Sequence, residues 1–132
     1  MRSGLVSLLV NEATVSAIVG SRVYVTRAPQ QAAYPHLIIT QMGTEENKSL
    51  DQTSGLRFIT FDIDCKAQTS VGAETLANAV RTFIDDYTGT AGSFTVGAVL
   101  LGGESDDYES PTDGSDKGVY VVTLDVQIQY NP

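Results

Sequence analysis

The chain has 132 residues, a length that fits one domain able to bury its own core. Its 42% hydrophobic and 18% charged residues are typical of globular proteins and exclude the disordered, collagen-like and membrane classes. The formal charge of −8 argues against tight binding of nucleic acid, and the single cysteine, Cys65, excludes an internal disulfide and is compatible with synthesis in the cytosol. We expect one soluble domain over residues 1–132.

The first twenty residues predict helix. Apolar side chains recur at helical spacing before and after a possible N-cap at Thr14, namely Leu5, Leu8, Leu9, Val15, Ile18 and Val19. We expect one broken helix or two short ones, ended by Gly20. The apolar run from Leu5 to Val10 is too short for a signal peptide, and no stretch approaches the roughly 20 residues that cross a bilayer. We therefore expect no membrane segment.

Two strands flank a connection marked by proline. Residues 22–26 alternate in polarity, and residues 36–42 form a second β-rich run. Pro29 has no amide donor and Pro35 holds the preceding residue extended, so the residues between the two runs must leave the sheet. Such a connection also protects a sheet edge from unwanted pairing.

The middle of the chain predicts a polar excursion followed by a central strand. Residues 43–55 are polar with turn residues at both ends, so they form either a long exposed loop or the tip of an extended hairpin. Loops of about a dozen residues are uncommon unless they bind something or are disordered. Residues 56–67 then alternate strictly, with Ile59, Phe61 and Ile63 on one face.

Residues 70–86 predict an amphipathic helix that docks on a sheet. Polar residues fill one side, and the other carries an apolar stripe made of Ala73, Leu76, Ala77, Val80, Phe83, Ile84 and Tyr87. Each of the larger apolar side chains contributes about 1.5 to 3 kcal/mol when buried. That contribution is enough to hold the helix against the sheet.

The C-terminal third predicts further strands around an acidic segment. Residues 93–101 predict a strand or hairpin, residues 102–118 carry six acids and one lysine and predict a solvated, mobile segment, and residues 119–130 predict the last strand. The order is α, β, β, β, α, β, β. We expect an α+β domain: a mainly antiparallel β-sheet packed against an amphipathic helix and a short N-terminal helical segment, with long polar loops.

No residue carries a catalytic signature. His36, the only histidine, stands at a strand entry without a nucleophile motif nearby, and Cys65 has the parity of the buried face. Glycine motifs that cradle phosphate are absent. We expect an ordinary strand or interface histidine, an inert core thiol, no catalytic residue and no cofactor.

Asp62 and Asp64 share one strand face with Cα atoms about 6.6 to 6.8 Å apart. This spacing suits a divalent cation or a carboxylate pair, but alternating acids on a wet face explain it as well, and no third ligand stands nearby. The acidic segment lacks the spacing of a calcium loop. We expect no metal site, and a small metal- or ligand-binding domain stays open as the alternative from another class.

Three apolar residues have the parity of the wet face, namely Phe58, Val119 and Val121. If their strands are neighbours, these side chains form an exposed apolar patch. Either the N-terminal helix covers this patch or it is a subunit interface.

Several short motifs in a fixed order resemble the tail-completion family of long-tailed bacteriophages, which are tail terminator or tail-to-head joining proteins. The motifs are V-G-S-R-V-Y at 19–24, R-A-P at 27–29, Tyr34-Pro35-His36-Leu37, S-L-D at 49–51 with Ser54-Gly55-Leu56, A-N-A-V-R at 77–81 and D-D-Y-E at 106–109. The resemblance covers nearly the whole chain. Where many members have Asp-Gly, this chain has Asp51-Gln52, which changes the expected turn.

The resemblance implies a structural virion protein of the tail or neck that is not an enzyme and is made in the host cytoplasm. It implies a hexameric ring that caps the tail tube, ends its polymerisation and contacts the head connector or a head-closure protein. Head-to-tail interfaces close into such rings when their rotation closes. DNA passes through the ring without specific binding. Another neck or tail ring protein, such as a head-closure protein or tube subunit, is the alternative within the same biology.

On this reading two polar segments make the contacts. In residues 43–55 we expect contacts to a neighbouring subunit, the tube or the connector from Glu45, Glu46, Lys48, Leu50 and Asp51. The acidic segment 104–116 is expected to face the lumen or a partner, where negative charge repels DNA, through Glu104, Asp106, Asp107, Glu109, Asp113 and Asp116.

Overall fold

The computed structural model describes residues 2–29, 32–46, 57–85, 87–91, 94–110 and 118–131, which form helices and one β-sheet. The helices are α1 (Arg2–Asn11), α2 (Ala13–Val19) and α3 (Ser70–Ile84). The strands are β1 (Val23–Val25), β2 (His36–Glu46), β3 (Arg57–Ala67), β4 (Gly89–Ala91), β5 (Phe94–Glu109) and β6 (Val119–Asn131). The predicted α+β class is confirmed. None of the helices in these ranges is long and apolar enough to span a bilayer.

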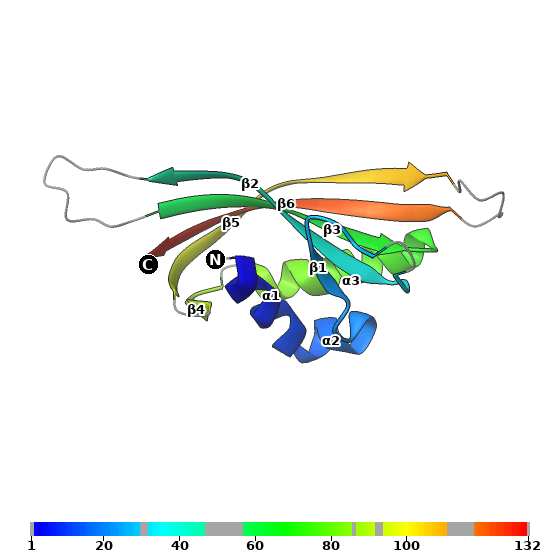
Figure 1. Ribbon diagram of the computed structural model, residues 1–132, viewed down its shortest axis with the longest axis horizontal. Helices are drawn as coiled ribbons and strands as arrows, with labels where there is room; N and C mark the ends of the chain where they lie inside the picture. Colours follow the sequence, from blue (N-terminus) through cyan, green and yellow to red (C-terminus); the bar gives the residue numbers. More distant parts are fainter. Residues whose placement is uncertain are drawn as a thin grey trace, which may run out of the picture.

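The strands form one sheet in the order β1-β2-β3-β6-β5-β4 (Figure 1). All pairs are antiparallel except β1 and β2, which run parallel. The described residues that connect β1 to β2 lie outside the strands, as the prolines predict. The mainly antiparallel sheet is therefore confirmed, with β3 and β6 at its centre.

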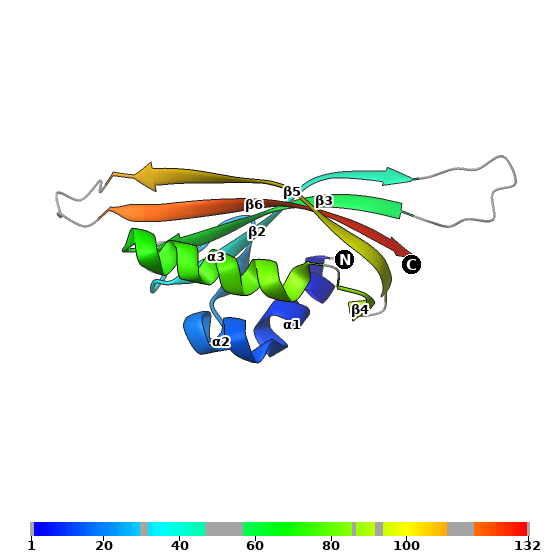
Figure 2. The same cartoon turned by 180° about the vertical axis from the view of Figure 1, so that it is seen from behind.

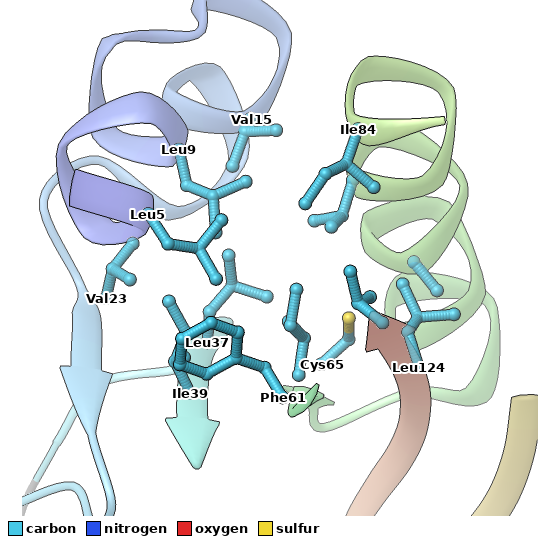
Figure 3. Packing of buried hydrophobic residues seen from close by; sticks show 14 of the residues in the cluster. Leu5, Leu9, Val15, Val23, Leu37, Ile39, Phe61, Cys65, Ile84 and Leu124 are labelled. Atoms are coloured by element: carbon cyan, nitrogen blue, oxygen red, sulfur yellow. The ribbon is translucent and has the colours of Figure 1, made fainter. Parts of the chain in front are cut away.

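All three helices lie on one face of the sheet (Figures 1 and 2). Alternation along β3 buries Phe61, Ile63 and Cys65 completely against them. Figure 3 shows Leu5, Leu9 and Val15 from the N-terminal helices, with Ile84 of α3 across from them, closing over the strand residues of this core. The alternation and the helical stripe read from the sequence thus meet in one apolar layer.

Helix boundaries follow local chemistry, with one correction. Gly20 ends α2 as predicted, with a φ of 61° and its N–H donating to the carbonyl of Ser16. Thr69 caps α3, because its hydroxyl accepts from the N–H of Gly72 at 3.0 Å. The predicted cap at Thr14 is wrong: the chain is extended at Glu12, so α2 begins at Ala13 and encloses Thr14.

The acidic segment is the main correction to the predicted fold. Residues 102–109 were expected to be a mobile loop, but they continue β5, which pairs with β6 as far as the Glu109–Val119 register pair. The long alternating run of β6 offers a ladder to this segment, and acids are tolerated there because their side chains stay exposed. The short strand β4, which makes a hairpin with β5, was not resolved by the sequence pattern.

Residues 43–46 belong to β2, which pairs with β3 from Glu46 opposite Arg57. The four described residues of the segment 43–55 thus continue the β2–β3 ladder. Residues 47–56 lie outside the described residues, and so do Lys48, Leu50 and Asp51.

Candidate functional site

The acids of β5 lie on both faces of the sheet. The register pairs Glu104 with Leu124 and Asp106 with Val122, on the helix-covered face, whereas Asp107 and Glu109 share the open face with Val121 and Val119. All four acids are exposed. Asp113 and Asp116 lie outside the described residues. The four described acids of this segment are thus divided between two faces, because a strand alternates its side chains.

On the helix-covered side a hollow of about 370 Å³ lies between α3 and the ends of β5 and β6. Glu74, Glu104 and Asp106 make its lining acidic. Arg81 of α3 forms an ion pair with Glu104 and donates to Asn78 Oδ1 at 2.5 Å. This partly exposed ion pair ties α3 to β5 and contributes at most about 1 kcal/mol.

On the open face, carboxylates of the two central strands stand close together. Asp62 is the register partner of Asp125, and Asp64 accepts a hydrogen bond from the Thr123 hydroxyl at 2.8 Å. Partial burial, and then the charges of Asp125 and Asp64, raise the pKa of Asp62 above its ordinary value. Like charges opposite each other destabilise a sheet, so this polar face is held in place by the core on its other side.

The described residues contain no group of three or more His, Cys, Asp or Glu side chains placed to hold a metal ion. Asp62 and Asp64 do share one face, as predicted, but Asp64 is engaged with Thr123 and not with a converging set of ligands. Farther along, Lys66 pairs with Glu109 at 2.8 Å across β6. The open face is therefore a polar surface on which neighbouring side chains form hydrogen bonds and ion pairs with one another.

His36 lies in a small aromatic cluster at the start of β2. It is 2% exposed, its ring stacks on Tyr34 at 4.7 Å between centroids, and Tyr24 meets it edge-on at 5.5 Å. Its Nδ1 lies 3.0 Å from the carbonyl oxygen of Ala33, which can only accept, so Nδ1 carries the proton. Burial is the largest cause that lowers the pKa of His36. The predicted role as an ordinary strand residue fits this setting.

Cys65 is fully buried in the core, and burial raises the pKa of its thiol. The thiolate is the reactive form of cysteine, so this thiol is inert at neutral pH. The prediction of a core cysteine is confirmed.

The predicted apolar patch on the open face does not form. Phe58 pairs with Gln129 near one end of the β3–β6 ladder, whereas Val121 pairs with Lys66 near the other, with Val119 beyond it. The antiparallel register separates these positions although their strands are neighbours. The N-terminal helix does not cover them either, because it packs on the opposite face with α3. Phe58 and Val119 are half-buried and Val121 is buried.

Some residues with a structural role gave no sequence signal that we recognised. Arg22 donates from Nε to the carbonyl of Pro35 at 3.0 Å and from Nη2 to that of Ile18 at 3.3 Å, which fastens the connection between β1 and β2. Met42 on β2 and Leu100 on β5 are 59% and 60% exposed. Leu100 pairs with Gln127 on the open face, and Met42 lies at the register shift between Gln41 and Gly43, features that the sequence does not reveal.

Comparison with known proteins gives three findings. Residues 3–131 match a family model described as "Tail completion protein gp17". A chain from a solved "Virion of native gene transfer agent (GTA) particle" has a similar fold, with a TM-score of 0.69 and 14% identity over 99% of this chain and 93% of that chain. A second solved chain gives a TM-score of 0.52 and 14% identity over 100% of this chain and 98% of that chain. No curated protein matches.

Proposed function

The chain belongs to the tail completion protein gp17 family of phage tail structural proteins, and we propose that it is a tail terminator. Copies form a ring, expected to be hexameric, that caps the tail tube, ends its polymerisation and joins the tail to the head connector or head-closure protein. The protein is made in the host cytoplasm and acts in the virion as a structural subunit without enzymatic activity. The observation that carries this proposal is the family match over residues 3–131.

The architecture supports an assembly role. Its single helix-covered face holds the core, while the other face and the strand ends present polar and exposed groups. A subunit that binds like copies at its sides and other virion proteins at its ends needs this division. Glu45 and Glu46 stand at the end of β2, and we assign the segment 43–55, to which they belong, to contacts with the tube, connector or a neighbouring subunit.

The β5 acids are proposed to face the DNA path. Asp107 and Glu109 on the open face add to Asp62 and Asp125, so these acids outnumber the basic Arg27 and Lys66, which line one hollow on this face. Negative charge repels phosphate and lets DNA pass without sticking.

Deleting the gene from the phage tests the proposed function. We expect free filled heads and tails of irregular, extended length in electron micrographs, because nothing stops tube polymerisation, and we expect the wild-type gene to restore joined particles. A matched variant replaces residues 47–56 with a short turn and should leave a folded subunit that joins fewer heads to tails. Joined particles with tails of normal length in the deletion strain would overturn the proposal. Localisation of the protein elsewhere in the virion would favour a tube or head-closure role.

A further inference from the structure

Two long strands of the sheet have outer edges that the short edge strands cover only in part. Within the described ranges, β1 pairs with β2 only at Leu37–Ile39, and β4 pairs with β5 only at Phe94–Val96. Beyond these pairs, the outer edges of Met42–Glu46 on β2 and Gly97–Glu109 on β5 have no described strand beside them. An unpaired edge presents backbone N–H and C=O groups and is a template for another strand.

The two free edges match in strand direction and in level, that is, in their position along the strands as the register across the sheet gives it. Neighbours β2, β3, β6 and β5 are antiparallel in turn, so β2 and β5 run in opposite directions. The register leads across the sheet from Gly43 through Thr60 and Gln127 to Leu100. A second copy placed beside the first in the same orientation therefore sets its Met42–Glu46 against Gly97–Leu101. The pair is antiparallel, like the four long strands within each copy.

Bulges and short strands bound the matched segment of β5. The register with β6 slips at Gly97, one residue beyond the β4 pairing, and again at Gly102. In the neighbouring copy, β1 occupies the edge of β2 at Ile39, close to the level of Gly102, so a joined ladder must end there. A β-bulge bends its strand, and the register shift at Gly102 marks the same limit on β5.

Side chains in the matched segments suit the approach of another backbone. A Cβ on Gly43 would meet nothing within 4 Å, and one on Gly97 would meet only the Gln129 carbonyl oxygen at 3.8 Å. Neither has a positive φ, so nothing within the chain requires glycine there. Glycine in a strand is typical of sites where a second backbone comes close. Leu100 and Met42 are 60% and 59% exposed, and they lie one position apart in this pairing, because Gly43 faces Leu100.

Charge favours the same alignment. The segment Gly97–Leu101 contains no charged residue, although the chain carries a net charge of −8. The matched level sets Glu45 and Glu46 opposite residues 96–98 and away from the acids that begin at Glu104. Like charges directly opposite each other destabilise a ladder, so a register shifted toward the acids would be weaker.

We propose that copies of this chain join head to tail by antiparallel β-pairing of Met42–Glu46 of one copy with Gly97–Leu101 of the next. The sheet then continues from subunit to subunit, with the helices of every copy on the same side. Because one edge differs from the other, the contact is heterologous and propagates until its rotation closes a ring. The inference rests on the proposed function in one respect, namely that the chain assembles with itself.

The test is disulfide cross-linking in phage particles that carry the double variant Gly43→Cys/Leu100→Cys, because the register sets these two positions opposite each other. Facing residues of an antiparallel pair have Cα atoms about 4.5 to 5.5 Å apart, within the range that a disulfide spans. The native Cys65 is buried and does not interfere. After oxidation we expect a ladder of covalent oligomers on a denaturing gel, ending at the size of the ring.

Two controls make the outcome specific. Val71→Cys/Leu100→Cys places one thiol on a 70% exposed position of α3 and should give no ladder. Leu100→Cys alone should stay monomeric, because head-to-tail pairing never brings two β5 edges together. A dimer of that single variant would show two-fold β5 pairing and overturn the inference. Particles that contain the double variant at the tail end without a ladder would overturn the edge pairing and leave the proposed function standing. Absence of the protein from the tail end would overturn the proposed function itself.

If the cysteine variants do not assemble, hydrogen exchange of the wild-type chain tests the edge pairing. We expect the amides of Met42–Glu46 and Gly97–Leu101 to exchange at least tenfold more slowly in particles than in the isolated subunit. Unchanged exchange in both segments would overturn the inference.

Discussion

The two faces of the sheet are built from the same strands but hold very different side chains. On β3, Phe61 points to the helix-covered face and is fully buried, whereas Phe58 on the open face is half-buried. On β6, Leu124 is buried next to Ile63, while Asp125 stands exposed opposite Asp62. The helix-covered face therefore supplies the free energy of folding, and the open face and the edges are left for contacts with other molecules.

Because of this division, residues on the open face and the edges can be substituted to change assembly contacts without unfolding the subunit. Alternation gives each strand one residue for the core and the next for the surface. The start of β2 is an exception, because the connection from β1 brings Tyr34 against His36 on the open face and buries it. Three substitutions test the division between the two faces.

The largest effect is expected from Phe61→Ala. The ring is 0% exposed in the core, and its removal leaves a cavity that costs about 3 to 5 kcal/mol of the free energy of unfolding. Urea denaturation followed by circular dichroism measures the loss. The matched control is Phe58→Ala on the same strand, which should cost far less because its side chain keeps water contact. Equal losses at the two positions would contradict the division between the faces.

His36→Phe tests the buried exception on the open face. The phenyl ring keeps the stack on Tyr34 but removes the donor to the carbonyl of the exposed Ala33, at a cost of about 0.5 to 1.5 kcal/mol. Burial lowers the pKa of His36 below 6.5, so below that pH the unfolded chain binds more protons than the folded one. The free energy of unfolding of the wild type should therefore decrease as the pH falls below 6.5, by up to about 1.4 kcal/mol per pH unit from this group.

Denaturation at several pH values separates the two effects. The His36→Phe variant should lack this part of the pH dependence, whereas Tyr34→Phe, which keeps the imidazole and the stack, should retain it. If His36→Phe kept the slope of the wild type, His36 would not be the group that titrates.

The smallest effect is expected from Asp62→Asn on the open face. The pKa of Asp62 is raised above 3.8, so the folded state holds its proton more tightly and loses stability as the pH rises through that region. At neutral pH the amide relieves the repulsion with Asp125 and should stabilise the fold by about 0.2 to 1 kcal/mol. The gain should vanish below pH 3.8, where Asp62 is protonated in both states.

A double-mutant cycle gives the control for this prediction. Asp62→Asn and Asp125→Asn relieve the same repulsion, so the double variant should be less stable than the sum of the single gains predicts. Simple additivity would show that the two carboxylates do not interact.

Local pattern predicted most elements because it reflects one physical requirement, that each element buries one face. Alternation in β3 and the apolar stripe of α3 depend only on nearby residues, and both were read correctly. The acidic end of β5 was missed, since charge suggested a loop and the partner that holds it, β6, follows later in the chain. The predicted patch of Phe58 and Val121 failed because shared parity gives the face of a residue but not its level along the ladder.

By itself, the sequence determined the α+β class, the central strand, the main helix, the buried cysteine and the family resemblance, because each is written in residues close together in the chain or in their order. Only the tertiary structure decided which face the N-terminal helix covers, how the β5 acids are divided between two faces, and which strand edges stay open. These properties depend on register and on strand order, which arise when distant segments pair. No local pattern contains that information.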